Sequence, residues 1–223
     1  MKSQLALRFS IISSAILVVA IYFIYPAFSW PLGLEAYECL IALLILAASA
    51  IIHWLFRNKS IIILQTKNVT VGLWIGLLWT IEIGINNIIH PGLPLRDIVD
   101  NIFWAVIAIL ILIFTTFEAF HTKKIFAGII SGFWIGIASG TIACLTALIL
   151  IVFGMSYILN DPLNLKEWSD VAKSAHFPNM AVYFAYQTLT GAIMHFVILG
   201  AIMGTILGAF GGIIGKSADS FKK

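Results

Sequence analysis

The side chains best suited to chemistry lie in one apolar stretch, "TIEIGINNIIHPG" at residues 80 to 92. Glu82 and Asn86 are four residues apart and share one stripe of a helix, whereas Asn87 lies on another face. A carboxylate at the bilayer centre costs about 2.5 to 3.5 kcal/mol, so such a group faces protein or a wet cavity rather than lipid. Glu82 is therefore the first candidate for a proton or polar-substrate site, lined by the two asparagines.

His195 is the best partner for Glu82 by its predicted depth in the last apolar run. A carboxylate and an imidazole that meet inside a membrane, with Asn86 as a third member, would suit proton coupling or a polar substrate. The alternative is that these residues only join helices, because intramembrane hydrogen bonds of this kind are worth about 0.6 kcal/mol each and need no chemistry.

A second polar group follows in "HPGLPLRDIVDN" at residues 90 to 101. Pro91 and Pro94 are expected to exclude regular helix there, and Asp97 is expected to cap the helix that follows rather than to bind a metal. Acidic side chains in an outward vestibule, including Asp100, would attract cations. No cofactor or metal is predicted, and Cys39 and Cys144 lie too far apart in the predicted spans to indicate a disulfide or metal cluster.

These polar residues are embedded in a chain with the composition of an integral membrane protein. Of its 223 residues, 61% are apolar and only 10% are charged, against about 25% charged in soluble domains. Apolar runs of about 20 residues match a hydrocarbon core of about 30 Å. The sequence predicts an all-α polytopic transmembrane bundle that forms a single membrane domain over residues 1–223. The six predicted spans cover about 9–30, 37–56, 70–90, 99–120, 125–153 and 181–213.

The distribution of Lys and Arg predicts the orientation of these spans. Alternate connections carry ten basic residues on one side and three on the other, and positively charged loops stay in the cytoplasm. We therefore expect a cell-membrane protein with both termini cytoplasmic. The net charge of +3 is a topology signal, which leaves no basic patch for nucleic acid. A cleaved signal peptide ending near "AFS" is the alternative interpretation of the first span, and a retained helix is favoured.

Two other segments have predicted positions. The long connection at about 155–180 contains "NLKEWSDVAKSAHF", with Leu165, Trp168, Val171 or Ala172, and Ala175 on one stripe, and is expected to lie in the outer interface as a capping loop or as a lid. Near the cytoplasmic interface, snorkelling accounts for His53, Glu118 and His121.

Glycines recur every four residues in the fifth and sixth spans. This spacing gives one face without side chains, on which another helix backbone approaches closely. The ladders are Gly128, Gly132, Gly136 and Gly140, and Gly200, Gly204, Gly208 and Gly212, with a weaker one at Gly72, Gly76, Thr80 and Gly84. We expect spans five and six to pack antiparallel through these faces. The alternative is that one face joins two copies of the chain or a partner membrane subunit.

The third span is expected at the centre of the bundle, because neither its small-residue face nor its Glu82 stripe suits lipid. In addition, "GLWIG" at 72–76 matches "GFWIG" at 132–136. This match raises the hypothesis of a duplicated helical hairpin, in which spans three and four correspond to spans five and six.

The sequence contains none of the common enzyme motifs, namely HExxH, GxSxG, a P-loop or GxGxxG. An enzyme is accordingly the third choice. The leading hypothesis is a small transport-type protein, either a permease or a substrate-capturing protein, with an intramembrane site at Glu82, Asn86, Asn87 and His195. The alternative is a non-transporting scaffold or accessory subunit of a larger complex, in which the same residues serve as packing contacts.

Overall fold

A computed structural model describes residues 2–25, 34–55, 59–170 and 177–220. It is 94% helical, and no strand occurs in these residues. The helices are α1 (Lys2–Ile24), α2 (Leu34–Leu55), α3 (Lys59–Gly84), α4 (Leu93–Thr122), α5 (Ile125–Phe153), α6 (Met155–Asn160), α7 (Pro162–Asp170), α8 (Met180–Met194) and α9 (Met203–Ser220). Two π-helical segments, Ile85–Ile89 and His195–Ile202, continue α3 and join α8 to α9.

Five helices within the described ranges are long and apolar enough to cross a membrane. They are Lys2–Ile24, Lys67–Ile89, Leu93–Thr122, Ile125–Phe153 and the 39-residue run Met180–Ala218. The predicted span 37–56 corresponds to α2, whose apolar part, Tyr37–Ile52, is shorter. The all-α bundle is confirmed, and the chain is a multi-pass, membrane-embedded protein.

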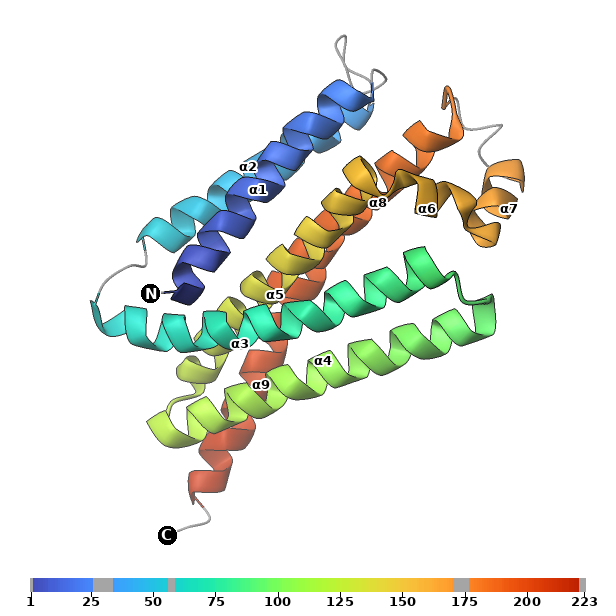
Figure 1. The fold of residues 1–223 in the computed structure, drawn as a ribbon. Helices are drawn as coiled ribbons and strands as arrows, with labels where there is room; N and C mark the ends of the chain where they lie inside the picture. The colour runs from blue at the N-terminus through green and yellow to red at the C-terminus, as the bar shows by residue number, and fades with distance from the viewer. Residues whose placement is uncertain (1, 26–33, 56–58, 171–176, 221–223) are drawn as a thin grey trace.

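The bundle has two distinct ends. Figure 1 shows the start of α1 and the last turns of α9 at one end, and the α3–α4 turn at the other. α6 and α7 lie transverse to α5 near the α3–α4 turn (Figure 1). α7 carries Leu165, which is 49% exposed, and Trp168, which packs on Tyr183 with ring centroids 5.8 Å apart. The other members of the predicted stripe, Val171, Ala172 and Ala175, lie outside the described residues.

α5, rather than α3, occupies the centre of the bundle, so the expected central position of the third span is wrong. The most apolar window of α5 is 72% buried, against 44% for α3. α5 contacts α1, α3, α4, α8 and α9. The physical reason is that small side chains such as Ser131, Ala138 and Ser139 line α5 between its glycines and are buried too, which lets neighbours approach it from several sides.

The glycine faces of α5 and of the α8–α9 run meet within the chain. A Cβ atom added at Gly128 would lie 2.7 Å from the carbonyl oxygen of Gly208, and one added at Gly204 would lie 2.6 Å from that of Gly132. Contacts this short leave no room for a side chain. The same packing includes Gly136 against Gly200, Gly140 against the His195 backbone, and Gly212 against Ile125.

Glycines on two other helix faces are packed differently. On α3, a Cβ at Gly72 would meet the Ile135 carbonyl oxygen at 2.5 Å, and one at Gly76 would meet Ile142. The glycines of "GLWIG" thus contact α5, whereas those of "GFWIG" contact the α8–α9 run, so the two matching segments are packed against different partners. Sequence reasoning also missed Gly211 and Gly215 of α9, which lie against the α4 backbone.

α4 begins earlier than the sequence pattern predicts. Its N-cap is Gly92, and Pro94 lies within its first turn, where a missing backbone N–H costs nothing because no intrahelical acceptor is available. The expected cap at Asp97 is therefore wrong. Asp97 instead lies in the second turn, and its backbone carbonyl accepts a hydrogen bond from Asn101. Because α4 begins at Leu93, Asp100 lies beside the end of α3, within hydrogen-bonding distance of Asn86.

Candidate functional site

Glu82 lies at the end of α3 with only 6% of its surface exposed. Its Oε1 accepts a hydrogen bond of 2.9 Å from Nδ2 of Asn86. The same nitrogen donates to Oδ1 of Asp100, on α4, at 2.7 Å. One neutral amide thus connects two carboxylates from two helices. We call Glu82, Asp100 and Asn86 together "the carboxylate pair with its amide".

The local backbone explains why these side chains converge. The α-helical pattern of α3 gives way at Ile85 to a π-helical segment that contains Asn86. Short π-helical segments change the angular position of the residues that follow them and are frequent at functional sites. His90 then adopts a left-handed conformation, with φ of 54°, and ends the helix before Pro91. The chain reverses into α4, which returns Asp100 to the level of Asn86.

Arg96 extends this polar contact toward α7. Its Nη2 donates to the backbone carbonyl oxygen of Asn86 at 2.9 Å and to Oδ2 of Asp161 at 2.7 Å. The side chains of Arg96 and Asp161 are 18% and 3% exposed. Asp161 Oδ1 also accepts from the Leu163 backbone N–H at 3.0 Å. A largely buried ion pair therefore joins the start of α4 to the α6–α7 junction.

Several buried polar atoms of the carboxylate pair with its amide and of Arg96 have no hydrogen-bond partner among the described residues. Within the described part of the chain, Glu82 Oε2, Asn86 Oδ1 and Arg96 Nε are buried without a hydrogen-bond partner, and the fourth such atom, Ser14 Oγ, lies on α1. Buried polar atoms are nearly always hydrogen-bonded to protein or to water. Three of these four atoms therefore belong to one connected group, formed by Glu82, Asn86 and Arg96.

The other two predicted site residues are placed differently. Asn87 donates to its own helix, from Nδ2 to the Ile83 carbonyl oxygen at 2.8 Å. His195 Nδ1 donates to the Gly191 carbonyl oxygen at 2.8 Å, since a carbonyl only accepts. The His195 ring packs edge-on against Trp79, with centroids 5.1 Å apart. The structure brings Glu82 and Asn86 together, and the expected hydrogen bond between Glu82 and His195 is not formed.

Sequence reasoning assigned no site role to Arg96 and Asp161, and it placed Asp100 only in a vestibule. A signal for Arg96 and Asp161 was present, because each is a charged residue directly beside a long apolar run. Their pairing across 65 residues had no local signature.

Glu118 also differs from its expected role as a snorkelling residue. It is buried on α4, far from Asp100 along that helix, and accepts an ion-pair hydrogen bond of 2.9 Å from Lys67 Nζ. A neutral hydrogen bond nearby, from Asn68 Nδ2 to Ser131 Oγ at 2.9 Å, joins α3 to α5. Polar pairs therefore join helices at both ends of α4, but atoms without partners occur only in the group at Glu82 among the described residues of these two ends.

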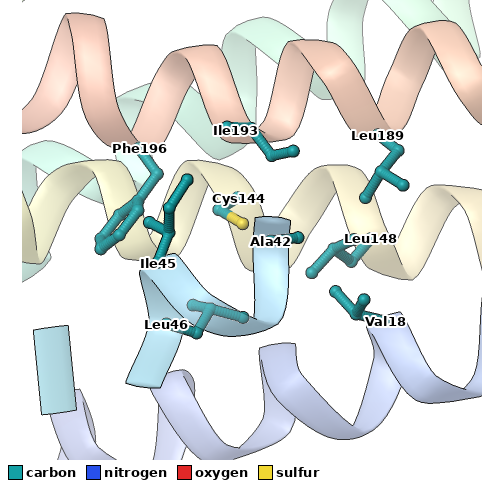
Figure 2. A pocket seen from close by; sticks show the side chains of 9 residues that line it. All are labelled: Val18, Ala42, Ile45, Leu46, Cys144, Leu148, Leu189, Ile193 and Phe196. Carbon is teal, nitrogen blue, oxygen red and sulfur yellow. The ribbon is translucent and has the colours of Figure 1, made fainter. Parts of the chain in front are cut away.

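A small void lies in the apolar core among α1, α2, α5, α8 and the π-helical segment His195–Ile202, as Figure 2 shows. Its volume of about 10 Å³ is at the lower limit for a single water molecule, which would also need two or more polar partners. The lining residues are Val18, Ala42, Ile45, Leu46, Cys144, Leu148, Leu189, Ile193 and Phe196. This void is a packing defect rather than a solute site.

No cluster of three or more His, Cys, Asp or Glu side chains suited to a metal ion occurs in the described residues. No family model matches the sequence, and neither a curated protein nor a solved structure is significantly similar to it. The chemistry of the carboxylate pair is thus the main guide to function.

Proposed function

We propose that this chain is a small transport-type membrane protein, a permease or a substrate-capturing protein, with its polar site at Glu82. The observation that carries the proposal is the carboxylate pair with its amide, in which a nearly fully buried Glu82 keeps an unpartnered oxygen inside a predominantly apolar span. Such groups are expensive in a membrane and usually mark substrate or ion pathways. Asp100 and Asn86 take part in the site directly. His195 packs against Trp79, and Asn87 is hydrogen-bonded to its own helix, so we assign neither a direct contact with the carboxylates.

The proposed location is the cell membrane, with both termini in the cytoplasm. The excess of Lys and Arg on the connections at the side of the termini supports this orientation. Since Figure 1 shows the α3–α4 turn at the opposite end from the start of α1 and the last turns of α9, the site lies toward the outer side in this orientation. The surrounding partner is the lipid bilayer.

Proton-linked uptake into liposomes tests the proposal. Purified protein is reconstituted with an enclosed pH-sensitive dye, and a panel of small polar solutes is added outside. We expect at least one solute to produce a pH change that depends on the protein and is lost in Glu82→Gln, which keeps the shape of the side chain. Transport that is unchanged in Glu82→Gln removes this residue from the mechanism.

A scaffold or accessory subunit is the second candidate function. It is favoured by the fact that the hydrogen bonds of Asn86 to Asp100 and of Arg96 to Asp161 all join separate elements, as packing contacts in membrane proteins do. For a scaffold, Glu82→Gln and His195→Phe change thermal stability or the co-purification of a partner subunit, while no solute flux depends on either residue.

A further inference from the structure

We infer that the carboxylate pair with its amide binds a small monovalent cation of sodium size, in exchange for a proton. This inference deepens the proposed function, on which it rests for its role in transport, by naming the coupling ion. The residues concerned are Glu82 and Asp100, with the Asn86 side chain between them.

The first support is the unused acceptor oxygens. Glu82 is 94% buried, since only 6% of its surface is exposed, and its carboxyl group points at Asn86, which holds Oε1. Glu82 Oε2 and Asn86 Oδ1 both lack a donor among the described residues. Both oxygens therefore have lone pairs that can coordinate a cation.

The second support is the charge balance. Arg96 is the cation next to this site, but Asp161 already pairs with it at 2.7 Å. Glu82 and Asp100 remain, and both accept a hydrogen bond from one neutral nitrogen. In a medium of low dielectric constant, two carboxylates this close repel each other strongly, and either a proton or a metal cation between them removes the repulsion.

The donor set selects the kind of cation. Calcium takes six to eight oxygen ligands, and magnesium usually keeps several of its waters. This buried site offers two carboxylates and one amide oxygen, which is fewer ligands than calcium takes. Sodium sites in transporters use fewer carboxylates and are built where a helix is interrupted, near its negative C-terminal end. The end of α3 at Ile85–Ile89 has this character.

Exchange of one proton for one sodium ion leaves the net charge of the site unchanged. The other ionisable groups near the pair are Arg96 with Asp161, from α4 and the α6–α7 junction, and His195, which is within electrostatic reach of Asp100. His195 is hydrogen-bonded to the Gly191 carbonyl oxygen, whereas Glu82 and Asp100 both accept from Asn86, so the scheme assigns the exchanged proton to the two carboxylates.

Equilibrium binding of ²²Na⁺ to the purified full-length chain tests the inference. Ionic strength is held constant with N-methylglucamine chloride, and binding is measured from pH 5 to pH 8. We expect saturable binding of about one ion per chain that weakens toward pH 5, with release of about one proton per ion bound. Glu82→Gln and Asp100→Asn each weaken the affinity at least about tenfold, a change of about 1.4 kcal/mol. Asp97→Asn is the matched control, because Asp97 is exposed and lies about one turn from Asp100 on α4. We expect the Asp97→Asn protein to bind sodium as the wild type does.

Absence of saturable binding by the wild-type protein overturns the inference, and so does equal loss of binding in Asp97→Asn. If Glu82→Gln does not fold, the sodium affinity of Asp100→Asn and the pH dependence of binding by the wild type test the inference instead. Flux that depends on Glu82 without sodium binding refutes the cation and keeps the proposed function. Sodium binding that depends on Glu82 in a protein that moves no solute keeps the site and refutes transport.

Discussion

At the scale of single residues, Asn86 connects the polar groups of the candidate site. Its side-chain nitrogen holds two carboxylates, and its backbone carbonyl oxygen accepts from Arg96. An aliphatic residue at this position would leave both carboxylates without this donor. This arrangement explains why an asparagine is found in an otherwise apolar stretch.

The Arg96–Asp161 ion pair makes a stability prediction at the same scale. Asp161→Asn leaves the Arg96 charge largely buried without a counter-ion, and removal of one partner of a buried pair costs about 3 to 5 kcal/mol. We expect a loss of this order in the free energy of unfolding, measured by denaturant titration in detergent micelles. The double variant Arg96→Met with Asp161→Asn should recover part of the loss. An Asp161→Asn protein as stable as the wild type would show that the pair has no structural role.

At the scale of elements, the close approach of α5 to α9 depends on missing side chains. A Cβ at Gly132 would overlap the backbone of Gly204 and Gly208, and backbone atoms move only together with their helix. At Gly191, in the interior of α8, a Cβ would meet nothing within 4 Å. These two glycines therefore provide a matched comparison.

We predict opposite effects of alanine at the two positions. Gly132→Ala lowers the free energy of unfolding by about 1 to 3 kcal/mol through overpacking. Gly191→Ala raises it by about 0.5 to 1 kcal/mol, because alanine favours helix more than glycine does. Parallel denaturant titrations in detergent measure both. The same sign of change at both positions would contradict the packing described for α5 and α9.

At the scale of the whole molecule, the start of α1 and the last turns of α9 lie at one end of the bundle and the α3–α4 turn lies at the other (Figure 1). The polar site is beside this turn, because Asn86 and Arg96 on either side of it are hydrogen-bonded to each other. The proposed orientation predicts which end faces outward. In a protein with Cys39 and Cys144 replaced by alanine, a membrane-impermeant maleimide should label Ser169→Cys in intact cells, and should label Lys216→Cys only after permeabilisation. Both positions are exposed in the structure. Labelling of Lys216→Cys from outside would reverse the orientation.

The apolar runs were sufficient to predict the helical membrane bundle, and the four-residue spacing of Gly128 to Gly140 pointed to a face used for close packing. The central place of α5 was not predicted, because Ser131 and Ser139 gave no signal comparable to Glu82. The candidate site was predicted in part. Glu82 and Asn86 are neighbours on one helix, so spacing alone predicts their contact. Asp100 and Asp161 reach the site only through the early start of α4 and the turn into α7, which local patterns do not encode.

The central claim is that the carboxylate at Glu82 serves transport rather than packing. The most direct test compares Glu82→Gln with Glu118→Gln, because both carboxylates are buried, but Glu118 is paired with Lys67 at the other end of α4. Initial flux per folded protein is measured in liposomes for both variants. We expect flux to be lost in Glu82→Gln and retained in Glu118→Gln. Equal flux in the two variants, whether lost or retained, would contradict the central claim.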